Sequence, residues 1–214
     1  MNSKIQLIDN LTLIKLFYKY KLNISSNAQS YADSATEICK DLFYALENTS
    51  IDDIISIIKE DFIAFEIKSY DVPQFSDLNI CCYKIIEALI CSGLESIDFE
   101  TMGKLLRKKD GKIGANIKYG ENQAKTAAQM SLCYIENGQI RPTLLGTEFY
   151  KLPDNKKRTI ATRLLLRLPL IQNYYASNEN IKVIMNDISI LKESTQTRRL
   201  SSIHNIIDRI NTER

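Results

Sequence analysis

The chain has 214 residues, of which 44% are hydrophobic and 25% charged, with a formal net charge of +2 at pH 7. These values are typical of a soluble globular protein that buries a core, as one large domain or two small ones. A content of only 7 Gly and 4 Pro disfavours a turn-rich β-sandwich or barrel. Because no run of about 18 apolar residues occurs and the first residues lack a signal-peptide pattern, we expect no membrane contact and a cytoplasmic location.

The charge is strongly segregated along the chain. Residues 1–100 hold 8 Lys, no Arg and 16 Asp or Glu, a net charge of −8. Residues 101–170 hold 14 Lys or Arg and 5 Asp or Glu, a net charge of +9, and residues 171–214 add +1. A basic block behind an acidic one predicts a module that binds a polyanion, joined to a segment with another role.

The cysteine and histidine residues indicate no metal or redox site. The five cysteines are odd in number, lack CxxC spacing and sit in apolar contexts, so we expect reduced thiols in the core. They are Cys39, Cys81, Cys82, Cys91 and Cys133. His204 is the single histidine, which leaves little for a His-based metal site or a catalytic triad. The main interpretation therefore includes no catalytic residue, metal or cofactor.

In chain order, residues 1–75 are predicted to form an acidic helical domain that contacts a partner or mediates dimerisation. Apolar residues recur at helical spacing over 32–43 and over 54–62. Between these stretches, Ser50 is expected to cap a helix with acidic residues in its first turn, where carboxylates suit the positive helix end. The helical pattern ends near Pro73.

Residues 76–153 are predicted to form a winged helix. The expected elements are a helix to about Cys91, a second over 98–106, a third from Asn122 to Leu132, a hairpin around Asn137-Gly138 and a helix from about Gly146. Asn-Gly between two β-prone runs is a strong signal for a two-residue turn in which both residues take positive φ. This is the winged-helix order, in which the third helix lies in a DNA groove.

Residues 154–214 are predicted to form a second segment resembling a helix-turn-helix, with helices over 155–168 and 180–187 and a last helix from Ser194 or Thr195. Hydroxyl and guanidinium groups gather in the first turns of the last helix, where they suit phosphate and base-edge contacts. These residues are Thr195, Thr197, Arg198, Arg199 and Ser202. Alternatively, the two arginines pair with the acidic N-terminal domain.

Two groups of residues in the winged-helix region are predicted to contact DNA. The loop group is expected to bind backbone phosphates and consists of Lys104, Arg107, Lys108, Lys109 and Lys112. The groove-reading group consists of Lys118, Tyr119, Asn122, Gln123, Lys125, Thr126 and Gln129. Asn and Gln side chains can pair bidentately with adenine, and Lys can reach phosphate or guanine. The alternative for both groups is a merely solvated surface.

Three stretches of the chain resemble a known family. They are residues 119–132 (YGENQAKTAAQMSL), 143–153 (TLLGTEFYKLP) and 194–203 (STQTRRLSSI). They are similar to winged-helix modules of bacterial type II restriction endonucleases and related restriction–modification proteins. In order, they resemble the recognition helix with its LGL-like turn, the LT-x-x-G-x-x-F helix start and the C-terminal S-T-x-x-R-R segment of those modules. In this chain Ser131 replaces the glycine of the LGL turn, and Pro142 replaces the leucine before Thr143.

The resemblance, which covers about residues 76–210, implies a mainly α fold with a small β wing. It also implies a protein that binds duplex DNA sequence-specifically within a restriction–modification system. The implied partners are double-stranded DNA, a second copy of the chain, and an endonuclease or methyltransferase subunit.

Two other functions stay open. The first is a type II endonuclease, in which two carboxylates hold Mg²⁺ while a lysine positions or activates a water. The candidates are Asp53 or Asp61 together with Glu66-Ile67-Lys68, although these residues also fit the solvated end of a helix. The second alternative is a protein-interaction scaffold, because winged helices also serve in that role.

Overall fold

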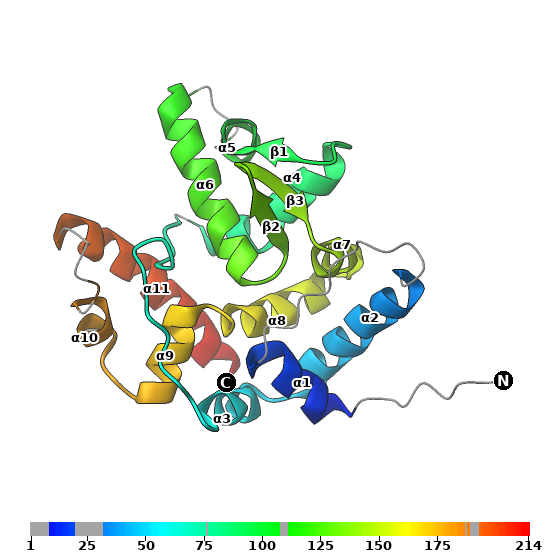
Figure 1. Cartoon of the computed structure of the whole chain (residues 1–214), viewed down its shortest axis with the longest axis vertical. Coiled ribbons are helices and arrows are strands. Elements are labelled where there is room, and N and C mark those ends of the chain that lie inside the picture. The colour runs from blue at the N-terminus through cyan, green and yellow to red at the C-terminus, as the bar shows by residue number, and fades with distance from the viewer. Residues whose placement is uncertain (1–8, 20–31, 76, 108–110, 187, 189–192) are drawn as a thin grey trace.

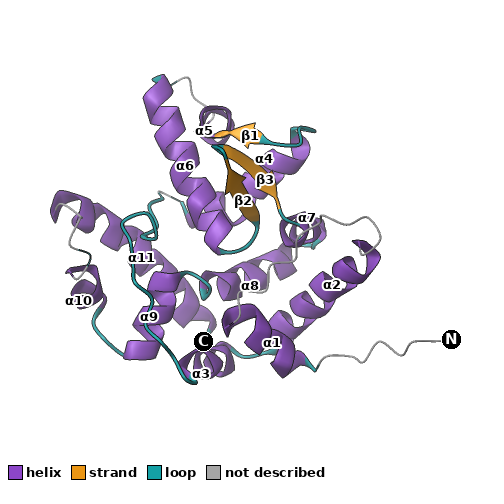
Figure 2. Cartoon of the chain, in the orientation of Figure 1, coloured by secondary structure: helices purple, strands orange, loops and turns teal. Residues whose placement is uncertain are grey.

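The computed structural model describes residues 9–19, 32–75, 77–107, 111–186, 188 and 193–214. It is mainly helical with a small amount of β structure, as the sequence predicts, and its strands form a three-stranded antiparallel sheet (Figure 2). The N-terminal helices are α1 (Asn10–Lys19), α2 (Ala32–Asn48) and α3 (Ile51–Lys59). Within the described ranges, no helix combines the length and apolar character needed to cross a membrane.

The middle of the chain holds all three strands. Its elements are the π-helical turn η2 (Ile80–Lys84), α4 (Ile85–Cys91), β1 (Ile97–Asp98), α5 (Phe99–Arg107), α6 (Ile113–Gln129), β2 (Cys133–Glu136) and β3 (Gln139–Pro142). β3 lies between the other two strands, with Ile140 opposite Ile97 of β1 and Ile135 of β2. The predicted hairpin turn is confirmed, because Asn137 and Gly138 take φ of 51° and 75°.

Helices α5 and α6 are in direct backbone contact. A Cβ atom added at Gly103 would lie 2.0 Å from the backbone oxygen of Asn116. One added at Gly120 would lie 2.1 Å from the backbone oxygen of Phe99. Only glycine fits at these two positions, so the two glycines set how closely the helices approach. The predicted start of the third helix at Asn122 is wrong, because α6 already begins at Ile113.

The end of α6 has a Schellman-type C-cap. The Leu132 amide donates to Ala127 O at 3.0 Å and the Ser131 amide donates to Ala128 O at 2.9 Å. This pattern requires a left-handed residue after the helix. Ser131 takes this conformation with φ of 63°, at the position where the resembled family has glycine.

The next helix, α7 (Leu144–Lys151), is tied to this turn. Thr143 caps it, because its hydroxyl accepts from the Gly146 amide at 2.9 Å and donates to Ser131 O at 2.6 Å. A Cβ atom added at Gly146 would lie 1.9 Å from Leu132 O, so this position also requires glycine. The T-x-x-G pattern thus has a local structural cause.

The remaining helices are α8 (Asp154–Leu165), α9 (Pro169–Ser177), α10 (Ile181–Asn186) and α11 (Glu193–Glu213). Helix α8 runs through the centre of the molecule, between the N-terminal helices and α11 (Figure 1). Helix α2 packs on α7 and α8, and α3 packs on α9. The buried residues of the N-terminal, middle and C-terminal segments belong to one hydrophobic core.

Part of the basic block serves these internal contacts. Lys156 of α8 forms an ion pair of 2.7 Å with Glu47 of α2. Arg163 donates through Nε to Thr49 O at 3.2 Å. Arg167 donates to Phe17 O at 2.8 Å, and its burial lowers the pKa of its guanidinium. The acidic N-terminal segment and the basic α8 are therefore partners within the chain.

Candidate nucleic-acid interface

Helix α6 exposes only its first turns. Its N-terminal end points away from α8 and α11 (Figure 1). The side chains of Lys112, Ile113, Ile117 and Lys118 are exposed there, Ile113 to 62% and Ile117 to 39%. We call residues 112–118 the α6 tip. Sequence reasoning missed the two isoleucines because it started the helix after them.

A buried asparagine holds the connection between α5 and the α6 tip. Asn116 is fully buried, and its Nδ2 donates to Gly111 O at 3.3 Å. Its Oδ1 accepts from Nη1 of Arg107 at 3.3 Å, and the Arg107 guanidinium also lies 5.7 Å from the centroid of the Tyr119 ring. These contacts fix Arg107, one of the predicted phosphate ligands, beside the tip.

The other residues of the predicted loop group are only partly described. Lys104 forms an ion pair of 2.5 Å with Glu100, one turn earlier on α5. Lys112 is exposed at the start of α6. Lys108 and Lys109 lie outside the described residues. Of the described members, Lys112 is thus part of the α6 tip and Arg107 lies beside it.

Two residues of the predicted groove-reading group are buried, and their prediction as DNA contacts is wrong. Gln123 is 0% exposed and Thr126 is 2% exposed. Because α6 begins earlier than predicted, this stretch lies in its second half, and the helix packs on η2, α5 and β2. Thr126 donates its hydroxyl to Asn122 O at 3.2 Å. Neither the nitrogen nor the oxygen of the Gln123 amide has a hydrogen-bond partner among the described residues.

Three other residues of that group, Asn122, Lys125 and Gln129, lie beside the segment 69–74. Gln129 donates through Nε2 to the backbone oxygen and to Oδ1 of Asp71, each at 3.3 Å. The Lys125 ammonium lies 6.0 Å from the Tyr70 ring centroid. Asn122 lines a small cavity of about 140 Å³ between α6 and this segment. These side chains are thus engaged within the molecule rather than presented on an open helix face.

Acidic Glu121 is neutralised by two lysines of the same helix. It forms ion pairs with Lys125 at 2.6 Å and with Lys118 at 3.3 Å. The hydrogen bond from Lys125 is the main cause that lowers the pKa of its carboxyl, and Lys118 adds to it. Glu121 therefore leaves one net positive charge on this stripe of α6.

The predicted contact residues of α11 divide into buried and exposed ones. Ser202 is 2% exposed and exchanges two hydrogen bonds with the backbone of Phe75, at 3.0 and 3.1 Å, so its prediction as a DNA contact is wrong. Arg199 donates to Ser69 O, and burial lowers the pKa of its guanidinium. Arg198 and Thr197 are exposed and Thr195 is half-buried. Arg199 also lines the small cavity, so the two predicted contact segments meet at residues 69–74.

The carboxylates proposed for a nuclease site are not gathered. Asp53 accepts from Ser50 Oγ at 2.7 Å as part of the cap of α3. Asp61 lies in the turn after α3, and Glu66 and Lys68 are exposed on a stretch without strand structure. Among the described residues, no three Asp, Glu, His or Cys side chains lie close enough to hold a metal ion.

The cysteines are free thiols, as the sequence predicts. Four of them are buried, and burial raises the pKa of Cys39 and of Cys133 to about 12. Cys91 is exposed, so the prediction of a core position is wrong for this residue. Its sulfur lies 3.4 Å from the Tyr150 hydroxyl.

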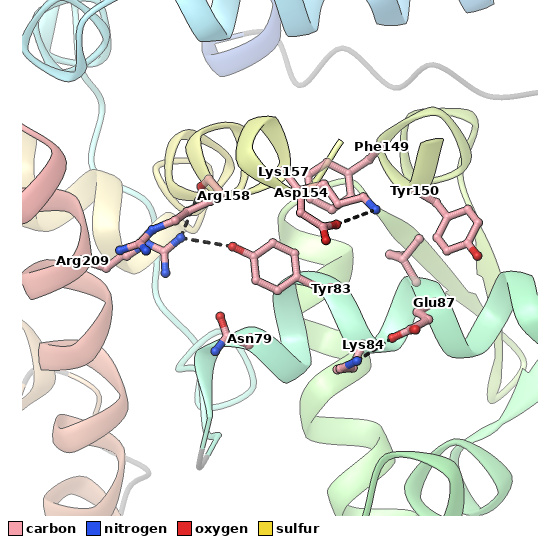
Figure 3. Close-up of a pocket in the computed structure, with 11 residues that line it drawn as sticks. Asn79, Tyr83, Lys84, Glu87, Phe149, Tyr150, Asp154, Lys157, Arg158 and Arg209 are labelled. Carbon is pink, nitrogen blue, oxygen red and sulfur yellow. Dashed lines mark hydrogen bonds and ion pairs between the residues drawn. The ribbon is translucent and has the colours of Figure 1, made fainter. Parts of the chain in front are cut away.

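A larger cavity of about 860 Å³ lies elsewhere, between η2 and α4 on one side and α7, α8 and α11 on the other (Figure 3). Its charged side chains include Lys84, Lys157, Arg158 and Arg209. Sequence reasoning missed this site because its residues come from three stretches far apart in the chain: η2 with α4, α7 with α8, and α11. The sequence predicts the helix that carries Lys157 and Arg158, but not its contact with Arg209.

The chain was compared with protein-family models, with curated proteins and with solved structures, and none of these comparisons found a match.

Proposed function

We propose that residues 80–151 form a winged-helix unit that binds duplex DNA through the α6 tip. The observation that carries the proposal is the element order: helix, strand, helix, helix and a two-stranded hairpin, with the strands arranged β1-β3-β2. In winged-helix proteins the third helix of this order enters the major groove, and its N-terminal residues contact base edges. Here that helix is α6, and its N-terminal end is the exposed one.

The chemistry of the α6 tip suits this role. Lys112 and Lys118 are exposed cations, and Arg107 is fixed beside them. Such groups neutralise backbone phosphates and supply sequence-independent affinity. The exposed side chains of Ile113 and Ile117 suit apolar contact with thymine methyl groups in the major groove.

The wing is expected to contribute less. Its turn reads Glu136-Asn137-Gly138-Gln139 and carries no cation. The nearest arginine, Arg141, forms an ion pair with Glu95, and this contact raises the pKa of its guanidinium. We therefore infer that phosphate neutralisation comes mainly from α5 and the α6 tip, and that the wing approaches the backbone with amide groups.

The restriction–modification role is the part of the proposal that rests on motif resemblance. Thr143 and Gly146 have a structural cause in the α6–α7 turn, so these motif positions support the fold rather than the role. Within that role, the chain acts as the DNA-recognition component. A second copy or a catalytic subunit would be its partner.

The test is fluorescence anisotropy with a labelled pool of random duplexes at several salt concentrations from about 50 to 200 mM. The double variant Lys112→Ala/Lys118→Ala should bind more weakly and reduce the slope of log affinity against log salt by about 2. The matched control is Lys40→Ala, an exposed lysine of α2 that is ion-paired with Glu37 at 2.6 Å. It should leave both quantities unchanged.

Two outcomes would contradict the proposal. If the wild-type chain fails to bind duplex DNA at low salt, a protein-interaction scaffold becomes the better interpretation. If the wild type binds but the double variant behaves like Lys40→Ala, the α6 tip is not the contact surface.

A further inference from the structure

The large cavity has the dimensions of a small-molecule site. It encloses about 860 Å³, within the range of about 300–1,000 Å³ typical of ligand pockets. One wall comes from η2 and α4 and the other from α7 and α8, and Arg209 of α11 lies at one end (Figure 3). A site between two packed parts of a chain is a common position for a small ligand.

Positive charge is in excess at the α11 end of the cavity. The Glu213 carboxylate is shared by three guanidinium groups, those of Arg209 at 3.2 Å, Arg163 at 3.6 Å and Arg158 at 4.0 Å. One carboxylate cannot balance three cations. Two of the three arginines, Arg158 and Arg209, line the cavity, so this end is suited to an anion.

The other charged groups of the cavity are balanced locally. Lys84 pairs with Glu87 at 2.8 Å, and Lys157 pairs with Asp154 at 3.5 Å. The first pair joins the end of η2 to the start of α4, and the second lies within the first turn of α8 (Figure 3). The unbalanced charge therefore falls on the two arginines and not on the lysines.

Arg209 is held in place, whereas Arg158 is open to a ligand. Arg209 donates from Nη2 to the Tyr83 hydroxyl at 3.1 Å and from Nε to Thr162 Oγ1 at 2.9 Å. Its side chain is 17% exposed, against 68% for Arg158. The same two nitrogens also donate within the protein to Glu213 Oε1 at 3.2 Å and to Arg158 O at 3.3 Å, so Arg209 can offer a ligand its Nη1 group. An exposed guanidinium with its planar fork beside a fixed one with Nη1 can bind an oxyanion from two sides.

Aromatic rings form the adjoining wall. Tyr83 lies parallel to Phe149, with ring centroids 6.3 Å apart and an interplanar angle of 6°. Tyr150 also lines the cavity, with the Lys157 ammonium 5.3 Å from its ring centroid. Tyr83 and Lys84 belong to the π-helical turn η2, and such turns are frequent at functional sites. A flat ring can pack against this wall.

We propose that this cavity binds a small organic phosphate that carries a flat ring, of the size of a mononucleotide. The phosphate lies between the Arg158 and Arg209 guanidinium groups, and the ring lies along Tyr83 and Tyr150. None of the residues lining the cavity belongs to the α6 tip, so the proposal does not depend on DNA binding.

The test is calorimetric titration of the full chain with AMP, adenosine and inorganic phosphate as separate probes. AMP should bind with a dissociation constant below about 1 mM, and each of the two fragments should bind at least about tenfold more weakly. Arg158→Ala should weaken AMP binding at least about tenfold, since it removes the exposed guanidinium and its fork of donors. Arg158→Lys should be intermediate, and Lys40→Ala should have no effect.

A second measurement does not depend on a variant. The ³¹P resonance of AMP should shift on binding to the wild-type chain, because its phosphate meets two guanidinium groups. The proposal is overturned if AMP does not bind, if adenosine binds as well as AMP, if the ³¹P resonance stays unchanged on binding, or if a folded Arg158→Ala protein binds AMP as the Lys40→Ala control does.

Discussion

The lack of a side chain at Gly146 allows the start of α7 to lie against the turn that follows α6. The backbone of Leu132 occupies the space where a Cβ atom of residue 146 would lie, 1.9 Å away. Backbone cannot yield as a flexible side chain can. We expect Gly146→Ala to lower the free energy of unfolding by more than about 2 kcal/mol, measured by urea denaturation.

Gly114 is the matched control for this substitution. It lies within α6, and a Cβ atom added there meets nothing within 4 Å. Gly114→Ala should raise the free energy of unfolding by about 0.5–1 kcal/mol, because alanine has the higher helix propensity. Equal effects of the two substitutions would show that the close approach of Leu132 is not what matters.

Gln123 gives the second prediction at the scale of a residue. Its amide is fully buried, and its two polar atoms have no hydrogen-bond partner among the described residues. Such burial costs about 1–3 kcal/mol. Gln123→Leu should therefore raise the free energy of unfolding by about 1 kcal/mol or more and leave DNA sequence preference unchanged. A destabilised variant would mean that the amide has a partner, such as a buried water.

The elements divide into those that the sequence could predict and those that it could not. Local sequence signals predicted the hairpin, from Asn137-Gly138, and the start of α3, where Ser50 caps the helix as predicted. They failed for β1, which has two residues and exists only by pairing with β3. They also failed for the start of α6, because the glycines at 114 and 120 interrupt the apolar pattern.

The candidate interface was predicted in its position along the chain but not in its exposed face. The basic loop and the third helix were both identified, and Lys112 and Lys118 are exposed as expected. The burial of Gln123 and the contact of Gln129 with Asp71 depend on how distant segments pack. No local pattern in the sequence encodes that packing.

Ser131 gives a prediction at the scale of the α6–α7 turn. It holds a left-handed conformation, with φ of 63°, in a Schellman-type cap where glycine is favoured. Ser131→Gly removes the steric cost of the Cβ atom and adds freedom to the unfolded chain. We expect a net rise of up to about 1 kcal/mol in the free energy of unfolding, measured by thermal denaturation. A loss of stability would show that the serine side chain has a role in the turn.

At the scale of the whole molecule, the segregated charge has two uses. Part of it joins the acidic N-terminal helices to α8, as in the ion pair of Lys156 with Glu47. The part around α5 and the α6 tip stays on the surface. The net charge of the block thus overstates the positive charge on its surface, because Lys156 and Arg163 are engaged within the chain.

The salt dependence of DNA binding follows from this distribution. If the α5–α6 region neutralises about six phosphates, raising salt from 50 to 200 mM should lower the affinity by about 10³. The slope should be the same for different duplex sequences, because phosphate contacts carry no sequence information. Anisotropy titrations at four or more salt concentrations measure it, and a flat response would argue against a phosphate-binding surface.

Selection of bound sequences from a random duplex pool tests the central claim most directly. If the α6 tip reads the major groove, repeated selection at about 50 mM salt should enrich a short common motif. The Ile113→Ala/Ile117→Ala variant should relax the sequence preference at one or two base positions, with a loss of about 1–3 kcal/mol of discrimination at each. The central claim is wrong if the wild-type chain retains no duplex, or if it enriches a motif that the variant selects unchanged.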